Sequence, residues 1–342
     1  MSDPDLVENI VKALDVKTGS TERRPVHTIG IGATGYFEPS PVAAKYCIAE
    51  HFDTDRTDVA VRFSNGSGSV DEHDGWNDVR GMAVRFYLQD SRPTDLVAMT
   101  LPEFFAPTPE TFLKFALEAR PAPCKRQSAW TKIREYLKLQ LPMPDPYENQ
   151  EERPDEGAIG FANDHLWAQP AVLNASAIGA PVSYVRAAYH AVHTFIVEGK
   201  DHIKRPVRFT WQPIEGVLNT VRTHSPDDDY LKGDLRRRVS KGPQRFSLMM
   251  MLGEIGDKFD DPTQAWPPHR IRINMGTLRI DDVPEDQQKH CEKLSFNPWL
   301  MTRGIDPSGD PILRIRKDVY QYSSERRHAI PCPFAGHGRD DK

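Results

Sequence analysis

Cysteines are few in this sequence and long apolar segments are absent, and both facts restrict what the protein can be. Four cysteines, at positions 47, 124, 291 and 332, are spread over 342 residues. They form no CxxC pair and no Cys/His cluster, so a zinc site is not indicated, and a disulfide framework is unusual in a chain of this length. No apolar run approaches the roughly 20 residues of a membrane-spanning helix. We therefore expect a cytoplasmic protein without a membrane partner.

An excess of positive charge is also missing. The formal net charge is −5, whereas a nucleic-acid-binding domain usually carries a basic face, so we expect no nucleic-acid partner. The first residues, from Met1 to Leu6, are acidic and lack the basic and apolar regions of a secretory signal. Hydrophobic residues make up 38% of the chain, and 29 prolines with 22 glycines indicate a real core connected by many turns.

Runs rich in β-branched and aromatic residues alternate with turn residues along the chain. They predict strands at 59–63, 82–87, 184–212 and 245–252. Residues with helical spacing predict helices at 4–16, 108–118 and 226–240. In the second of these helices, Thr108 is the expected N-cap and Pro109 the first helical residue. Strands and helices do not alternate regularly, so a doubly wound parallel sheet is not indicated.

One domain is expected over 1–342. Within it, residues 1–20 are interpreted as an N-terminal arm and 328–342 as a loose tail. Residues 119–160 are rich in proline and predict a surface excursion with one amphipathic stretch at 129–140.

Two small motifs near opposite ends of the chain carry the chemistry. His27 comes shortly before three closely spaced glycines, a density that permits close backbone approach. Their order is not GxGxxG, so a dinucleotide site is not indicated. Arg316 and Tyr320 are spaced i, i+4, which puts them on the same side of a helix. Taken alone, these residues are more often structural than catalytic.

Six segments in the same order resemble the catalase superfamily. They include Val26-His27 before the glycines, Arg62-Phe63-Ser64, and His193-Thr194-Phe195. The segments span 26–38, 61–64, 78–87, 95–105, 189–195 and 310–320. The resemblance implies an α+β fold: a catalase-like antiparallel β-barrel with peripheral helices and a C-terminal helix that carries the proximal ligand. It also implies haem b, with the Tyr320 phenolate on the iron.

The resemblance assigns roles to further residues. His27 would transfer protons on the distal side, with Ser64 bonding its ring. Asp310, His193 and Arg316 would form a chain behind the phenolate. The remaining haem contacts would come from Arg24, Val26, Arg62, Phe104, Phe112 and Arg327. For the last of these, Arg326 is an open alternative.

The chemistry of these residue types suits the roles. A tyrosine has an ordinary pKa near ~10, so a phenolate ligand needs the metal and a nearby guanidinium to stay deprotonated. Guanidinium groups match carboxylates such as the haem propionates. Phenylalanine walls would keep water away from the cofactor.

Three features depart from the large catalases. Met99 stands where they have a distal asparagine, and a thioether cannot donate a hydrogen bond. Thr100 would replace that donor only if the strand register shifted. Gly66 replaces the valine that narrows the channel, and the chain ends soon after the proximal helix. These changes resemble the small, catalase-related peroxidase branch.

The expected function is therefore a haem-dependent peroxidase. It would reduce H2O2 or organic hydroperoxides with electrons from a small-molecule donor and show weak catalase activity, with His27, Ser64 and Met99 as the catalytic-side residues. A fatty-acid hydroperoxide isomerase, like allene oxide synthases, is one alternative. A non-catalytic barrel that binds haem or lipid is another. A homodimer stays open.

Overall fold

The computed structural model describes residues 2–15, 22–69, 72–89, 91–119, 123–148, 150–155, 157–221 and 227–327, the side chains of 289 and 290 excepted. The tail expected at 328–342 and part of the arm expected at 1–20 lie outside the described residues. In the described part of the chain, no helix is long and apolar enough to cross a membrane.

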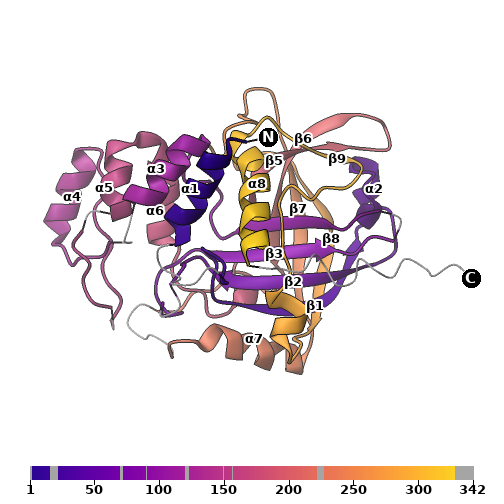
Figure 1. The fold of residues 1–342 in the computed structure, drawn as a ribbon, viewed down its shortest axis with the longest axis horizontal. Coiled ribbons are helices and arrows are strands. Elements are labelled where there is room, and N and C mark those ends of the chain that lie inside the picture. Colours follow the sequence, from indigo (N-terminus) through magenta and orange to yellow (C-terminus); the bar gives the residue numbers. More distant parts are fainter. Residues whose placement is uncertain are drawn as a thin grey trace, which may run out of the picture.

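An antiparallel barrel forms the centre of the structure (Figure 1). The order of the strands is β4-β3-β2-β1-β8-β7-β6-β5-β9, and a further pairing of β4 with β5 closes the first eight into a barrel. The closing pair is Met99 with His190. The predicted barrel is confirmed. The strands are β1 (Gly30–Pro39), β2 (Thr57–Asn65), β3 (Arg80–Phe86), β4 (Thr94–Met99), β5 (Tyr189–Glu198), β6 (Lys204–Pro213), β7 (Gln244–Leu252), β8 (Arg272–Asp282) and β9 (Ile305–Pro307).

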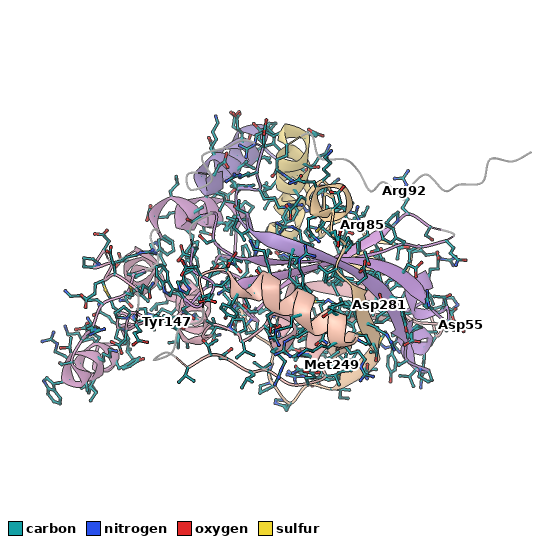
Figure 2. All side chains as sticks on the ribbon, turned by 90° about the horizontal axis from the view of Figure 1, so that it is seen from below. Asp55, Arg85, Arg92, Tyr147, Met249 and Asp281 are labelled. Atoms are coloured by element: carbon teal, nitrogen blue, oxygen red, sulfur yellow. The ribbon has the colours of Figure 1, made fainter. Side chains whose placement is uncertain are left out.

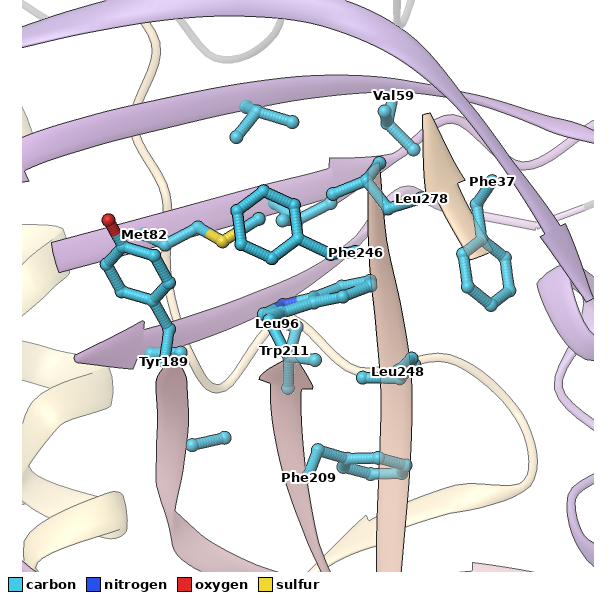
Figure 3. Close-up of a cluster of buried hydrophobic side chains, with 14 of the residues drawn as sticks. Phe37, Val59, Met82, Leu96, Tyr189, Phe209, Trp211, Phe246, Leu248 and Leu278 are labelled. Carbon is cyan, nitrogen blue, oxygen red and sulfur yellow. The ribbon is translucent and has the colours of Figure 1, made fainter. Parts of the chain in front are cut away.

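The alternation of side chains along each strand gives the barrel wall two different faces. In β2, Val61 and Phe63 are buried in the main hydrophobic core, whereas the alternating Arg62 and Ser64 line a cavity. Large aromatic side chains, including Trp211, fill the interior of the barrel (Figure 3). Because the interior is filled, a ligand site has to lie on the other face of these strands.

The helices lie outside the barrel. In Figure 1, α3, α4, α5 and α6 form a lobe at one end, and α1 and α8 lie between this lobe and the barrel. The helices are α1 (Pro4–Leu14), α2 (Ala43–Tyr46), α3 (Pro109–Glu118), α4 (Ala129–Leu137), α5 (Gly157–Asp164), α6 (Gln169–Ala177), α7 (Tyr230–Lys241) and α8 (Pro311–Arg326). Short 3-10 turns are η2 (Glu50–Phe52), η3 (Leu166–Ala168) and η4 (Tyr184–Arg186), and η5 (Gln288–Glu292) is a π-helical turn.

The start of α3 is as predicted. Thr108 is the N-cap, and its side chain accepts a hydrogen bond from the backbone N–H of Thr111, with Pro109 in the first turn. The predicted strand at 184 is wrong at its beginning, because Ser183 caps a 3-10 turn by accepting the Val185 N–H at 3.3 Å. The strand β5 starts only at Tyr189.

The N-terminal segment forms the helix α1, as its spacing predicts, and this helix is docked on α8. It lies outside the barrel, as expected, but α1 buries Val7, Ile10 and Val11 in one cluster with Ile315 and Val319 of α8. Since burial of a large aliphatic side chain contributes about 1.5–3 kcal/mol, α1 is a substantial part of what holds α8 in place.

A buried histidine makes the stability of the barrel core depend on pH. His51 in η2 is 2% exposed, and its ring centroid lies 4.1 Å from that of Phe52 and 4.5 Å from that of Phe86. Burial alone lowers its pKa from 6.5 to about 3. Between these two values the unfolded chain binds a proton that the folded protein does not, so the free energy of unfolding falls as the pH falls.

We predict that His51→Leu makes the protein less sensitive to acid. Because one proton uptake disappears, the fall in unfolding free energy between pH 6 and 4 should be smaller by about 1 kcal/mol per pH unit. Urea unfolding at several pH values measures this slope. Replacing the exposed His269 by leucine is the matched control at the surface. An acid slope that is unchanged in His51→Leu would contradict the prediction.

Candidate functional site

One cavity collects the predicted site residues. It has a volume of about 470 Å³ and lies against the outer face of β2–β4, with α3 and α8 contributing to its walls. Eleven of the thirteen residues expected from the sequence line it. The other two lie behind the wall: His193 bonds Arg316, and Asp310 bonds His193. The eleven are Arg24, Val26, His27, Arg62, Ser64, Met99, Phe104, Phe112, Arg316, Tyr320 and Arg327.

His27 is held by its backbone as well as by its ring. Its φ is +54°, in the left-handed region that non-glycine residues seldom adopt. The backbone N–H donates to the Gly66 carbonyl at 3.3 Å, and Arg62 Nη1 donates to the His27 carbonyl at 3.0 Å. Ring Nδ1 lies 3.0 Å from Ser64 Oγ, which is the contact expected for Ser64. These bonds compensate for the unusual backbone conformation.

The surroundings keep the His27 imidazole neutral. Burial lowers its pKa to about 3, and the nearby positive charges of Arg62 and Arg316 add to the effect. A neutral imidazole can accept a proton on one ring nitrogen. Ser64 engages Nδ1, and the Asn65 backbone also bonds the ring.

Gly81 is a residue that the sequence analysis did not single out. It pairs with Ser64 across β2 and β3. A Cβ at this position would lie 2.7 Å from Cε1 and Nδ1 of His27 and 2.7 Å from Ser64 Oγ. The missing side chain therefore makes the space in which the His27 ring meets Ser64.

Gly66 has a local reason for being glycine. A Cβ there would lie 2.4 Å from the Val79 carbonyl oxygen and 3.1 Å from Asp78 Oδ1. Close backbone packing between the two edges of the 66–79 loop therefore requires a residue without a side chain. Gly66 lines the cavity, and the wider channel expected from the sequence stays a prediction.

A chain of three short hydrogen bonds runs from Tyr320 into the protein. Arg316 Nη2 donates to Tyr320 Oη at 2.6 Å, and Arg316 Nη1 lies 2.6 Å from His193 Nε2. His193 Nδ1 lies 2.6 Å from Asp310 Oδ2. Because a guanidinium can only donate, His193 Nε2 accepts and Nδ1 carries the proton donated to Asp310. The side chains of His193 and Asp310 are each 1% exposed.

Asp310 also begins the helix that carries Arg316 and Tyr320. Its Oδ1 accepts the backbone N–H groups of Ile312 at 2.8 Å and Leu313 at 3.2 Å. Burial lowers the pKa of His193, while the Asp310 carboxylate partly opposes this shift. One carboxylate thus caps α8 and fixes the His193 ring.

Arginines gather at the other end of the cavity around Glu292, which sequence analysis missed. Arg24 Nη1 donates to Glu292 Oε2 at 2.6 Å, and Arg62 Nε donates to Oε1 at 3.2 Å. Burial and the charge of Arg62 lower the pKa of Arg24 to about 9. Burial raises the pKa of Glu292, but the two guanidinium groups outweigh it and hold that pKa below its ordinary value. The arginines therefore already bind one carboxylate.

The choice between Arg326 and Arg327 is decided by geometry. Arg326 Nη1 donates to Asp15 Oδ2 at 2.7 Å, which directs it to the segment after α1. Arg327 lines the cavity, and burial together with Arg62 lowers its pKa to about 10. Arg327 is thus the arginine that joins the cluster.

Apolar side chains complete the wall near Arg316. The rings of Phe104 and Phe112 have centroids 5.1 Å apart, and the Arg316 guanidinium lies 5.9 Å from the Phe104 centroid. Met99 packs against the same cluster. Thr100 Oγ1 accepts the Arg80 backbone N–H at 2.9 Å, so the strand register leaves Met99, and not the threonine, at the cavity.

The fold is that of catalases. It aligns with a fungal catalase, with a TM-score of 0.73 and 23% identity over 89% of this chain and 59% of that chain. For catalase A from Saccharomyces cerevisiae the TM-score is 0.74, with 21% identity over 89% of this chain and 61% of that chain. The family model described as Catalase matches residues 2–142 and 162–332. The chain belongs to the catalase family, and it is an oxidoreductase that acts on peroxide.

Its curated relatives include small and large members. A catalase-related peroxidase of Mycolicibacterium paratuberculosis is 29% identical over 325 residues, which cover 93% of this chain and 95% of that protein. One from Synechococcus elongatus is 25% identical over 94% of this chain and 88% of its own length. The catalase of Drosophila melanogaster is 29% identical over 90% of this chain but only 58% of its own length. The likeness to the small, catalase-related peroxidases is confirmed.

The family and the fold imply a haem cofactor, and the cavity fits one chemically. Tyr320 supplies a phenol oxygen beside Arg316, and His27 supplies a neutral imidazole in the same cavity. At the other end, Arg24 and Arg62 pair with Glu292, the one carboxylate that the ion pairs of the described residues give them, and Arg327 lines the cavity beside them. The excess of two positive charges matches the two propionates of a haem.

We predict that Gly81→Ala displaces the His27 ring and slows peroxide reduction by the haem-loaded protein. A misplacement of about 1 Å can cost roughly 10²-fold in rate, so kcat/KM for peroxide should fall by about that factor. Gly233→Ala is the matched control, because a Cβ there meets nothing within 4 Å. A variant with wild-type kcat/KM would show that the ring tolerates the methyl group.

Proposed function

We propose that the protein is a haem-dependent peroxidase. It reduces H2O2 or organic hydroperoxides with electrons from a small-molecule donor, and it has weak catalase activity. Haem b is its cofactor, and Tyr320 is the proximal ligand. The observation that carries the proposal is the bonded chain Asp310–His193–Arg316–Tyr320, in which each contact is 2.6 Å. We also propose that the protein is cytoplasmic and that the whole chain forms one domain. Whether it is a monomer or a homodimer stays open in this proposal.

Haem, when bound, supplies the metal and the redox chemistry of O–O cleavage. On the proximal side, Arg316 stabilises the Tyr320 phenolate, because a donated hydrogen bond and a positive charge both favour the ionised phenol. His193 and Asp310 hold the guanidinium in that position. Arg24, Arg62 and Arg327 bind the propionates, and Phe104, Phe112 and Val26 exclude water.

On the distal side, His27 moves the protons. Its neutral imidazole takes a proton from one peroxide oxygen and returns it to the other, so that an alcohol or water leaves. Overall, a hydroperoxide, two electrons and two protons give an alcohol and water, and the donor is oxidised by two electrons. Ser64 and Gly81 hold the ring for this step.

Met99 is the reason to expect weak catalase activity. Disproportionation needs a second peroxide that acts as reductant, and a distal hydrogen-bond donor orients it. A thioether offers no such donor, and Thr100 bonds the Arg80 backbone instead. The electrons therefore come from an external donor.

A fatty-acid hydroperoxide isomerase is the second candidate, favoured by the shape of the cavity. The cavity extends between the helices of the lobe, where Phe115, Ala158 and Val172 line it. An enzyme of the allene oxide synthase type would give an epoxide, formed from the hydroperoxide with loss of one water, without consuming a donor. A peroxidase would give the alcohol, so product analysis with a lipid hydroperoxide separates the two. The alternative of a non-catalytic barrel gives neither product.

We predict that Tyr320→Phe abolishes haem retention or shifts the ferric absorption spectrum, because the phenolate is lost and Arg316 keeps an unmatched charge. The spectrum and the haem content of purified protein measure this directly. Tyr322→Phe, in the same helix, is the matched control. A spectrum of Tyr320→Phe that is identical to wild type would refute the ligand assignment.

We predict that Met99→Asn raises the rate of oxygen evolution from H2O2, because the amide supplies the missing donor. An oxygen electrode measures this rate, and oxidation of an aromatic donor measures the competing peroxidase rate. Met99→Leu is the control that changes the side chain without adding a donor. If the unmutated protein already evolves oxygen as fast as it oxidises donors, Met99 is no handicap and this interpretation of the distal side is wrong.

A further inference from the structure

A second imidazole lines the cavity and takes no part in the steps proposed above. Of the described histidines, only His27 and His190 line it. His190 lies in β5 and is half-buried. Its Nδ1 lies 3.1 Å from Oγ1 of Thr210 in the neighbouring strand β6. Nε2 has no hydrogen-bond partner among the described residues, so one ring nitrogen is anchored and the other is available to a ligand.

His190 belongs to a row of paired residues that crosses three strands. Gly81 of β3 pairs with Met99 of β4, and Met99 pairs with His190 of β5. Directly paired residues project from the same face of a sheet. The His27 ring packs on this row at Gly81, where a Cβ would lie 2.7 Å from it. Neighbouring strands are about 4.8 Å apart, so His190 stands about 10 Å along the cavity wall from the residue on which His27 packs.

The wall around His190 is apolar and aromatic. Its cross-strand partner Met99 and its neighbour on the same face of β5, Val192, both line the cavity. These two side chains pack in one cluster with Phe104 and Phe105, whose ring centroids are 5.7 Å apart. Thioether sulfur and aromatic rings make favourable contacts. A small aromatic molecule would therefore find apolar partners here and one polar group, the His190 Nε2.

The His190 imidazole is neutral near pH 7. Burial lowers its pKa from 6.5 to about 4, and the positive charge of Arg272 in β8 adds to the effect. When Nδ1–H donates to Thr210 Oγ1, Nε2 carries a lone pair and can accept a proton.

We propose that His190 binds the reducing substrate, that this substrate is a phenol, and that Nε2 accepts the phenolic proton during oxidation. The inference rests on the proposed peroxidase function. The phenolic O–H bond breaks, its proton goes to Nε2, and its electron goes to the group that the hydroperoxide has oxidised. His190 then returns the proton to the water that forms. Overall, one hydroperoxide and two phenols give one alcohol, one water and two phenoxyl radicals.

A second peroxide is a poorer occupant of this position. H2O2 is small and polar, and the side chains of Met99, Val192 and Phe105 offer it no hydrogen-bond donor. A phenol buries its ring against the same wall and keeps its hydroxyl at Nε2. The mixture of one acceptor and an apolar surface therefore favours the phenol.

The cavity continues beyond this row into the lobe, where Tyr147 lines it. In Figure 2, Tyr147 lies among the helices of the lobe, away from the barrel. The cavity thus has a part beyond the barrel wall, which is the route by which a small phenol would approach His190.

Kinetics of the haem-loaded protein with two reductants and the same hydroperoxide test the proton step. Guaiacol is a phenol, whereas ferrocyanide gives an electron and no proton, so His190 has nothing to accept from it. His190→Phe and His190→Gln should lower kcat with guaiacol by about 100-fold or more and keep the wild-type rate with ferrocyanide. A glutamine amide bonds a hydroxyl but cannot take its proton, so KM for guaiacol should rise only in His190→Phe, by about 5-fold.

Equilibrium dialysis of guaiacol without peroxide tests the binding apart from turnover. His190→Gln should bind as wild type does, and His190→Phe about 5-fold more weakly. His269→Phe is the matched control, because His269 is exposed and does not line the cavity. It should behave as wild type in every assay.

Equal losses with both reductants would assign His190 a structural role, and unchanged guaiacol kinetics would remove it from the reaction. Either result overturns the proposal. Slower oxygen evolution from H2O2 with unchanged guaiacol oxidation would assign His190 to a second peroxide instead. If the wild type oxidises neither reductant, the peroxidase proposal fails and the proton step fails with it, while dialysis still decides whether His190 binds a phenol.

Discussion

The Asp310 carboxylate is the group on which the proximal half of the site depends. One of its oxygens accepts the first N–H groups of α8, and the other accepts from the buried His193. The beginning of the helix and the orientation of the imidazole are thus fixed by one side chain. The same helix delivers Arg316 to the cavity about two turns further on, and Tyr320 about three turns further on. Loss of this carboxylate would leave His193 Nδ1 and the first N–H groups of α8 without their acceptor, which is far more costly than the loss of one exposed bond.

The location of the site follows from the way in which the barrel is filled. Val61 and Phe63 point into a core that Trp211 and other large rings already occupy. The alternate residues of the same strand, Arg62 and Ser64, therefore supply the only face of β2 that can meet a ligand. The helices α3 and α8 then cover that face and close the cavity. The same alternation of side chains along β2 therefore supplies residues both to the core and to the site.

The elements that could be predicted from the sequence are those that a short sequence pattern specifies. The Thr108 cap with Pro109 is such a signal, and so is the i, i+4 spacing of Arg316 and Tyr320. The barrel closure and the joint position of the site residues came from the family resemblance, because pairing between distant strands leaves no local trace. Glu292 was missed for this reason: its partner Arg24 is 268 positions away. Gly81 was missed because its role depends on what a Cβ would meet across the sheet.

Helix α4 is a second case in which a local pattern was not enough to predict the structure. The amphipathic stretch at 129–140 was evident in the sequence, but periodicity does not say which face meets the protein. The Lys132–Asp145 ion pair turns the polar side inward.

The arginine cluster is the corresponding case for charge. The guanidinium groups of the buried Arg62 and the half-buried Arg24 and Arg327 repel one another, which is one reason why the pKa values of Arg24 and Arg327 fall. Glu292 offsets one charge, so the remaining repulsion among the guanidinium groups favours the binding of a ligand with two carboxylates.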